Sequence, residues 1–162
     1  MNIFTDGACK ENARKDGVAI GSGGWAYVVL TQAPGQDMKI DKKDSGHVAG
    51  TTNQEMEIQA VVEAFRLLGR VEEQINLYSD SAYVINCLKD RWYDKWKLNG
   101  WLNNKKQPVK NRDTWERLID AVSNYDVNFY HINRNSSKYI RVVDAMAKEA
   151  SRKGTNQGQQ VQ

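Results

Sequence analysis

Two aspartates follow short apolar segments that we expect to be strands. Asp6 follows Ile3-Phe4 and precedes Gly7, and Asp80 follows the segment 75–79. An apolar run that stops at a carboxylate and a turn residue is typical of a strand end. If the two strands are neighbours in one sheet, the carboxylates meet at one edge and repel each other by roughly 4 kcal/mol at about 4 Å. A cation between them would relieve that repulsion; alternatively, each aspartate caps a turn or the following helix.

A third carboxylate lies on the apolar face of the first expected helix. Val61, Ala64 and Leu68 follow Glu57 at spacings of 4, 7 and 11 residues, so at about 100° per residue they share its face. A buried glutamate is rare unless it is paired or bound to a cation. The residues alone leave the choice between a metal ligand and an ordinary packed carboxylate open for Glu57. Asp144, in the first turn of the last expected helix, is by itself most simply a helix-dipole carboxylate.

The positive charge is concentrated in one segment. The whole chain carries +3, but Lys89 to Arg112 holds eight basic and two acidic residues, or +6, so the remainder carries −3. Trp92, Trp96 and Trp101 are interleaved among these cations. For any one tryptophan, packing against a core is the simpler interpretation. Three together in the only strongly basic stretch favour a surface that follows a nucleic-acid backbone, with aromatic stacking platforms.

The chain length and the amino-acid composition predict one globular domain. A chain of 162 residues with 40% hydrophobic content can bury roughly 70% of its unfolded surface. No apolar run is long enough for a membrane span and the N-terminus lacks a signal-peptide pattern, so we expect a cytoplasmic protein. Cys9 and Cys87 are too few for a disulfide framework or a zinc site, and we expect reduced thiols. We expect residues 1–151 to form the domain and the Gln/Gly-rich residues 152–162 a disordered tail.

The order of elements predicts a mixed sheet with helices on it. In chain order the patterns predict strands at residues 3–6, 25–30 and 38–48, a helix opening at 51–57, a strand at 75–79, helices at 81–89 and 114–124, a strand at 127–132 and a helix at 142–151. The first three strands, with short connections, indicate an antiparallel meander. Residues 10–23 are polar with scattered glycine and indicate a loop.

Four motifs on that order closely resemble those of type 1 ribonuclease H. They are Phe4-Thr5-Asp6-Gly7, Thr51-Thr52-Asn53 with Met56-Glu57, Tyr78-Ser79-Asp80-Ser81, and Asp144-Ala145-Met146-Ala147. The basic segment is similar to the protrusion of that family. The resemblance implies an α/β ribonuclease H-like fold with a five-stranded mixed sheet, three antiparallel strands then two parallel, and helices on both faces. It also implies an endonuclease that cuts the RNA strand of RNA/DNA hybrids and leaves 3′-hydroxyl and 5′-phosphate ends.

The resemblance also implies a metal site and a substrate surface. The metal ligands and catalytic residues would be Asp6, Glu57, Asp80 and Asp144, holding two Mg²⁺ ions, with Mn²⁺ as a possible substitute. Family matches place Asn12, Asn53 and Gln54 at the minor groove, Thr52 at a DNA phosphate, and Trp96, Lys97 and Trp101 on the protrusion. Contacts of this kind recognise the shape of the duplex and its sugars rather than its bases, so we expect little sequence preference. Because the protrusion would contact phosphates, we expect binding that weakens steeply with salt. We expect a monomer.

The chain departs from the family pattern in one loop. Many members carry a histidine before the last helix, whereas here the loop reads Arg134-Asn135-Ser136-Ser137-Lys138. Either Arg134 or Asn135 would occupy that position, while His131 is expected on the strand, without a catalytic role. Two alternatives stay open: a catalytically weak or silent hybrid-binding module, and another nuclease of the same fold. A proofreading exonuclease would need a second acidic residue where this chain has Ala8.

Overall fold

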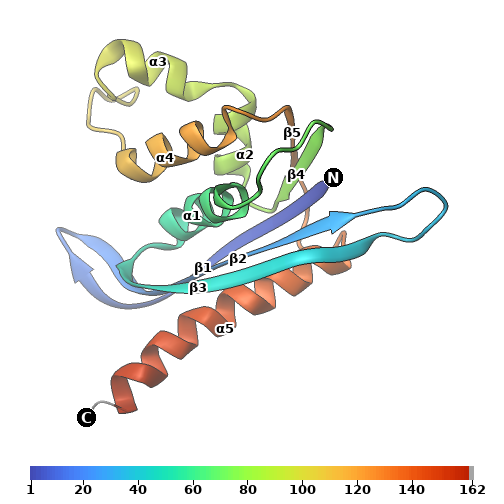
Figure 1. Cartoon of the computed structure of the whole chain (residues 1–162). Coiled ribbons are helices and arrows are strands. Elements are labelled where there is room, and N and C mark those ends of the chain that lie inside the picture. Colours follow the sequence, from blue (N-terminus) through green and yellow to red (C-terminus); the bar gives the residue numbers. More distant parts are fainter. Residues whose placement is uncertain (161–162) are drawn as a thin grey trace.

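The computed structural model describes the backbone of residues 1–160 and the side chains of residues 1–153. Residues 1–160 contain one five-stranded sheet in the order β3-β2-β1-β4-β5 (Figure 1). Its strands are β1 (Asn2–Lys15), β2 (Val18–Thr31), β3 (Lys39–Thr51), β4 (Ile75–Ser79) and β5 (Val127–His131). β1, β2 and β3 are antiparallel, and β4 and β5 run parallel to β1. The predicted mixed sheet of three antiparallel and two parallel strands is confirmed.

Helices cover both faces of the sheet, as predicted. They are α1 (Asn53–Arg66), α2 (Ala82–Lys89), α3 (Trp92–Asn99), α4 (Arg112–Val122) and α5 (Lys138–Gln160). α1, α2 and α4 lie over one face and α5 crosses the other, while α3 stands apart from the sheet beyond α2 and α4 (Figure 1). None of the helices in the described residues combines the length and apolar content that crossing a membrane requires.

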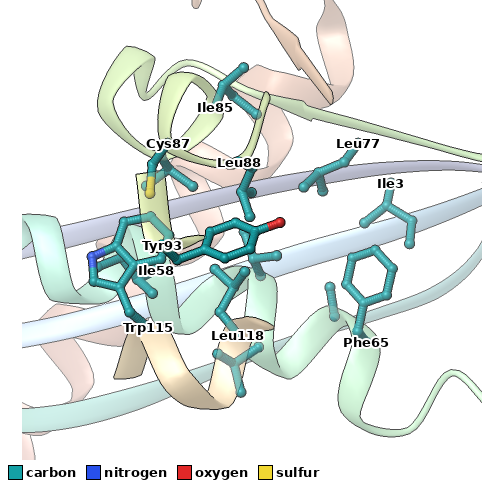
Figure 2. Close-up of a cluster of buried hydrophobic side chains, with 14 of the residues drawn as sticks. Ile3, Ile58, Phe65, Leu77, Ile85, Cys87, Leu88, Tyr93, Trp115 and Leu118 are labelled. Atoms are coloured by element: carbon teal, nitrogen blue, oxygen red, sulfur yellow. The ribbon is translucent and has the colours of Figure 1, made fainter. Parts of the chain in front are cut away.

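Two apolar clusters fix these layers. Side chains alternate along a strand, so Ile3 packs into the cluster under α1, α2 and α4, and Phe4 packs into the cluster under α5. Figure 2 shows the larger cluster, which includes Ile3 and Leu77 of the sheet and Ile58 of α1. These residues are fully buried, and each such side chain contributes about 2 kcal/mol to stability. The strands that carry Asp6 and Asp80 are therefore held from both sides.

The loop expected at residues 10–23 is wrong: most of this segment is strand. β1 and β2 continue as a hairpin to a two-residue turn at Asp16-Gly17, where both residues have positive φ (53° and 78°). Asp-Gly is a preferred pair for such a turn. The register shifts between Glu11 and Ala13, which leaves Asn12 at a bulge. The polar side chains of Lys10 to Lys15 are exposed because this hairpin projects beyond the helices (Figure 1).

The last helix is longer than predicted at both ends. α5 begins at Lys138 rather than Val142, and it continues past Ser151 to Gln160. The structure describes residues 152–160 as part of α5, and residues 161–162 lie outside the described residues. A helix anchored by packing extends at little cost through good helix formers such as Arg152 and Lys153. The division into a domain of residues 1–151 and a tail stays a prediction.

Candidate metal centre and nucleic-acid surface

Asp6 and Asp80 lie level with each other on neighbouring strands. Asp80 directly follows the end of β4, whereas β1 continues past Asp6 to Lys15, so the strand end expected at Asp6 is wrong. β1 and β4 are adjacent and parallel, and Phe4 is in register with Tyr78. Each aspartate comes two positions after its member of that pair, so the parallel pairing brings the two carboxylates together. Glu57 joins them from the first turns of α1. One carboxylate oxygen of each of the three residues lies within 4.8 Å of the others, and this acidic cluster could hold a metal ion.

Gly7 allows this close approach. A Cβ at Gly7 would overlap backbone atoms of Met56 and Glu57, so the start of α1 packs directly on the backbone of β1. The Gly7 N–H donates to Asp6 Oδ1 at 2.9 Å. The other oxygen, Asp6 Oδ2, is buried and has no hydrogen-bond partner in the described part of the chain. A buried carboxylate oxygen without a donor is a costly arrangement that a cation would satisfy.

Burial and crowding disfavour charge on two of these carboxylates. The pKa of Asp6 is raised from 3.8 to about 9, chiefly by burial, and then by the charge of Asp80 and the nearness of Asp144. The pKa of Glu57 is also raised, again chiefly by burial. A positive charge close to such groups favours their charged form. The side chains therefore fit a cation of hard-oxygen preference, such as Mg²⁺ or Mn²⁺.

Asp144 reaches the site from the opposite face of the sheet. It lies on α5 within hydrogen-bonding reach of Asp6, beside the three-carboxylate cluster rather than in it. Partial burial alone would raise the pKa of Asp144, but the pKa is lowered because Lys148, Asp6 and Arg134 stabilise the charged form. Lys148 Nζ lies 3.1 Å from Asp144 Oδ2. Asp144 is thus a charged neighbour of a proton-holding Asp6. The sequence analysis missed Lys148, although its spacing of four residues from Asp144 on one helix indicated the contact.

Arg134, from the loop before α5, lies beside two of the carboxylates. Its Nε lies 3.6 Å from Asp80 Oδ2 and its Nη2 lies 3.8 Å from Asp144 Oδ1. Asn135 has no such contact in the described residues; its N–H donates to Asn133 Oδ1. His131 Nε2 lies 3.1 Å from the backbone oxygen of Asp80, not from its carboxylate. Of the three residues named in the sequence analysis, the structure brings Arg134 to the carboxylates.

The start of α1 lies against the same site. Thr52 caps the helix, and its Oγ1 accepts from the Glu55 N–H at 3.1 Å. Asn53 Nδ2 donates to Glu57 Oε1 at 3.3 Å, which joins a predicted substrate residue to a carboxylate. Asn12 is different. It is exposed on the projecting hairpin, six residues and about 20 Å along the strand from Asp6, so the structure does not bring it to the carboxylates.

The basic segment folds around its tryptophans. Trp96 and Trp101 are only 8% and 7% exposed. The Trp96 ring lies 5.6 Å from that of Trp101 and 5.9 Å from that of Trp115. The expectation of open stacking platforms is therefore wrong for these two rings, because burying large aromatic rings is the stronger effect. Lys97 is exposed, over the Tyr93 ring. Substrate contact by Trp96, Lys97 and Trp101 stays a prediction.

A groove joins the start of α1 to the basic segment. A cavity of about 510 Å³ is lined by residues that include Gln54 of α1, Trp92 and Lys95 of α3, and Lys110. Trp92 is half-buried, so part of its ring is accessible. Cations beside an accessible aromatic ring are typical of a surface that binds a nucleic-acid backbone. Gln54 therefore links the start of α1, next to the carboxylates, to the basic segment.

Carboxylates that converge on a mixed sheet, with a basic segment beyond them, define a candidate metal-dependent site for a polyanion. The chain belongs to the ribonuclease H family, because the family model "RNase H" matches residues 1–152. The ribonuclease H of Thermoanaerobacter sp. (strain X514) is 38% identical over 158 residues, 97% of this chain and 93% of that protein. The ribonuclease H of Oleidesulfovibrio alaskensis is 40% identical over 136 residues, 84% and 79% of the two chains. The prediction of a ribonuclease H enzyme is confirmed.

Solved structures share the fold. LC9-RNase H1, described as a type 1 RNase H with the type 2 active-site motif, has a TM-score of 0.77 at 23% identity, over 93% of this chain and 71% of that one. LC11-RNase H1 in complex with an RNA/DNA hybrid has a TM-score of 0.67 at 20% identity, over 95% and 98%. A foamy viral protease-reverse transcriptase, also with an RNA/DNA hybrid, has a TM-score of 0.77 at 22% identity, over 93% and 20%. At these identities the likeness shows the fold alone.

Proposed function

We propose that this protein hydrolyses the RNA strand of RNA/DNA hybrids with the help of two divalent metal ions. The observation that carries the proposal is the convergence of Asp6, Glu57 and Asp80, from three separate segments, around a buried Asp6 oxygen that lacks a donor in the described residues. Family membership and the hybrid-bound LC11-RNase H1 of the same fold support the substrate. The products would carry 3′-hydroxyl and 5′-phosphate ends.

Asp6, Glu57, Asp80 and Asp144 would hold the metal ions and are the proposed catalytic residues. When bound, the two ions, Mg²⁺ or Mn²⁺, lower the pKa of the attacking water and stabilise the leaving 3′ oxygen. Asp6 is central because both Asp80 and Asp144 are close enough to raise its pKa. Arg134 and Lys148 balance part of the carboxylate charge from the solvent side. A net negative centre flanked by cations suits a site that must hold both a metal and a phosphodiester.

The surface around the carboxylates supplies duplex binding. Thr52, Asn53 and Gln54 line the path from the carboxylates into the groove beside α3, where Lys95 and Lys110 offer positive charge. We assign the RNA strand to the carboxylates and the DNA strand to the basic groove. RNA is distinguished from DNA by its 2′-hydroxyls, for which the side-chain amides of Asn53 and Gln54 are suitable partners. Lys97 would add a phosphate contact. We assign no substrate contact to Asn12, and expectations of a monomer and of a cytoplasmic location stay predictions.

Cleavage of labelled duplexes tests the proposal. RNA/DNA, RNA/RNA and DNA/DNA duplexes of one sequence are incubated with Mg²⁺ or Mn²⁺, and the ends of the products are identified. We expect cleavage of the hybrid alone, at the RNA strand. Cleavage of DNA/DNA would instead favour another nuclease of this fold, and hybrid binding without cleavage would favour a silent binding module.

Two variants assign the chemistry to the carboxylates. Asp80→Asn should reduce cleavage by a factor on the order of a thousand while hybrid binding persists, because the amide cannot neutralise a cation. Asp41→Asn is the matched control: Asp41 is exposed on β3, away from the carboxylates, and its substitution should leave the rate unchanged. Full activity of Asp80→Asn would contradict the proposed centre.

A further inference from the structure

A second hollow adjoins the carboxylates on the side of α5. It has a volume of about 390 Å³, and its walls are the β1 backbone from Gly7 to Lys10 and the α5 side chains from Asp144 to Arg152. Four cationic side chains line it: Lys10, Arg134, Lys148 and Arg152. Asp144 is the one carboxylate among its lining residues, all of which lie in the described part of the chain. The hollow is therefore electropositive and opens directly onto the site.

Two of these cations are not neutralised by the protein. Lys148 and Arg134 lie 3.1 and 3.8 Å from oxygens of Asp144, so their charges are partly balanced. Lys10 and Arg152 form no ion pair within residues 1–153, and both side chains are exposed. Their charges remain available to an external anion. Lys153, next to Arg152, points elsewhere and pairs with Glu149 at 3.7 Å.

The two walls of the hollow are fixed relative to each other. Lys10 is in register with Ser22 of β2, and the Ser22 hydroxyl donates to the Ser151 carbonyl of α5 at 2.6 Å. Ser22 and Ser151 are both buried. A Cβ at Gly24 would overlap the Ala147 carbonyl, so α5 lies directly on the β2 backbone. The backbone positions of Lys10 and Arg152 are thus set by the packing of the fold rather than by a mobile loop.

We propose that Lys10 and Arg152 form a binding subsite for a phosphate of the RNA strand, beyond the scissile phosphate on the α5 side. The inference rests on the proposed function. The hollow shares Gly7 and Asp144 with the carboxylate site, so the strand that presents its phosphodiester there continues into the hollow. From Asp144 to Arg152 α5 rises about 12 Å, whereas phosphates of one strand recur about every 3.4 Å along a duplex axis. The hollow therefore has room for phosphates beyond the one that is cut.

This subsite would act from the opposite side to the basic segment. In Figure 1, α3 and α5 lie on opposite sides of the sheet, with the sheet between them. The groove beside α3 and the hollow beside α5 can then hold different strands of one duplex, which would orient the hybrid across the carboxylates. A duplex held by its two backbones at separate points has a fixed orientation over the metal ligands.

The test measures hybrid affinity in the inactive Asp80→Asn background with Mg²⁺, over a range of salt concentrations. Lys10→Ala and Arg152→Ala should each raise the dissociation constant roughly three- to tenfold at low salt. The slope of the log association constant against log salt should become less steep by about 0.9 for each lost phosphate contact. Lys153→Ala is the matched control, because it removes the same charge from the adjacent position of α5 without touching the hollow.

Backbone-neutral substrates identify the strand. Single methylphosphonate linkages, which carry no charge, are placed in turn along the RNA strand and along the DNA strand of the hybrid. One or two RNA positions near the cleavage site should weaken wild-type binding but leave the affinity of the Lys10→Ala, Arg152→Ala double variant unchanged. A corresponding effect at DNA positions would assign the hollow to the other strand and overturn the proposal.

The proposal and the proposed function fail separately. If the wild-type protein cleaves the hybrid and the double variant binds it with unchanged affinity and salt slope, the subsite is wrong and the function stands. If Lys153→Ala weakens binding as much as Arg152→Ala, the effect is one of general charge and the subsite is again wrong. If the wild-type protein does not cleave hybrids at all, the proposed function itself has failed.

Discussion

Replacing Asp6 by asparagine should stabilise the metal-free protein, although it removes the proposed central ligand. Asp6 is 3% exposed, and its Oδ2 has no donor among the described residues. Its pKa lies near 9, chiefly because of burial and then because of Asp80 and Asp144. The folded protein therefore holds a proton that the unfolded chain releases above its ordinary pKa of 3.8. The associated stability is fully present below about pH 4 and is lost as the pH rises to about 9.

The expected gain in stability follows from the difference between the ordinary pKa of Asp6 and its pKa in the folded protein. One pH unit corresponds to about 1.36 kcal/mol, so the loss between the ordinary pKa and pH 7 is at most on the order of 4 kcal/mol. An asparagine needs no proton, and its amide can donate to the charged oxygens of Asp80 or Asp144. Burial of the neutral amide still costs part of this gain. We expect Asp6→Asn to raise the free energy of unfolding by roughly 2 to 3 kcal/mol at pH 8.

Urea unfolding in the presence of EDTA measures this change. Wild type, Asp6→Asn and the exposed control Asp41→Asn are compared at pH 5, 7 and 9. Wild type and control should lose stability as the pH rises, and Asp6→Asn should lose much less. Saturating Mg²⁺ should narrow or reverse the difference, because an ion that binds the native wild type alone stabilises it by mass action. Equal stability of Asp6→Asn and wild type at pH 8, or an equal dependence on pH, would refute the reasoning.

Two further substitutions test the geometry around the carboxylates. Gly7→Ala should lower the free energy of unfolding by about 3 kcal/mol and suppress cleavage, because its Cβ would overlap backbone atoms of Met56 and Glu57; near-normal melting and turnover would contradict that packing. His131→Ala should leave turnover within a few-fold, since the ring meets the backbone oxygen of Asp80 rather than a carboxylate; a loss on the order of a hundredfold in steady-state rate would show that the ring acts as an acid or base.

The sequence predicted part of the site for reasons that the structure explains. Asp80 was recognisable because it directly follows the end of β4, and strand ends can be read locally. The expected strand end at Asp6 is wrong, because β1 continues to Lys15; Asp6 meets Asp80 because β1 and β4 are adjacent and parallel. Glu57 was recognisable because the period of a helix places it on an apolar face. Asp144 was not recognisable in this way, because it reaches Asp6 from a helix on the opposite face of the sheet. Spacing along one helix carries no information on what lies across a sheet, and the family resemblance alone indicated Asp144.

The errors have similar physical causes. The outer half of β1 is exposed from Lys10 onward, and the facing part of β2 is buried through glycine and serine at residues 21–24 rather than through large apolar side chains. No apolar alternation therefore marks these halves as strands, and the Asp16-Gly17 turn was the one signal available. The prediction that the tryptophans form open stacking platforms was wrong for a different reason. Spacing shows that Trp92 and Trp96 share a face but not whether that face points inward. The chain folds back after α3, where the Val109 N–H donates to the Trp101 carbonyl at 2.8 Å, and that return buries Trp96 and Trp101.

The carboxylates are held together by packing, against their own repulsion. Glu57 is followed by Ile58, and Asp144 is preceded by Val143; both apolar side chains are fully buried, in the clusters on opposite faces of the sheet. Each such contact contributes about 2 kcal/mol, enough to oppose the mutual repulsion of carboxylates near the surface of a protein. Because the two clusters lie on opposite faces of β1, Glu57 and Asp144 are both held close to Asp6 only when both helix layers are packed on the sheet. A substitution that loosens either cluster should therefore weaken metal binding before it unfolds the protein.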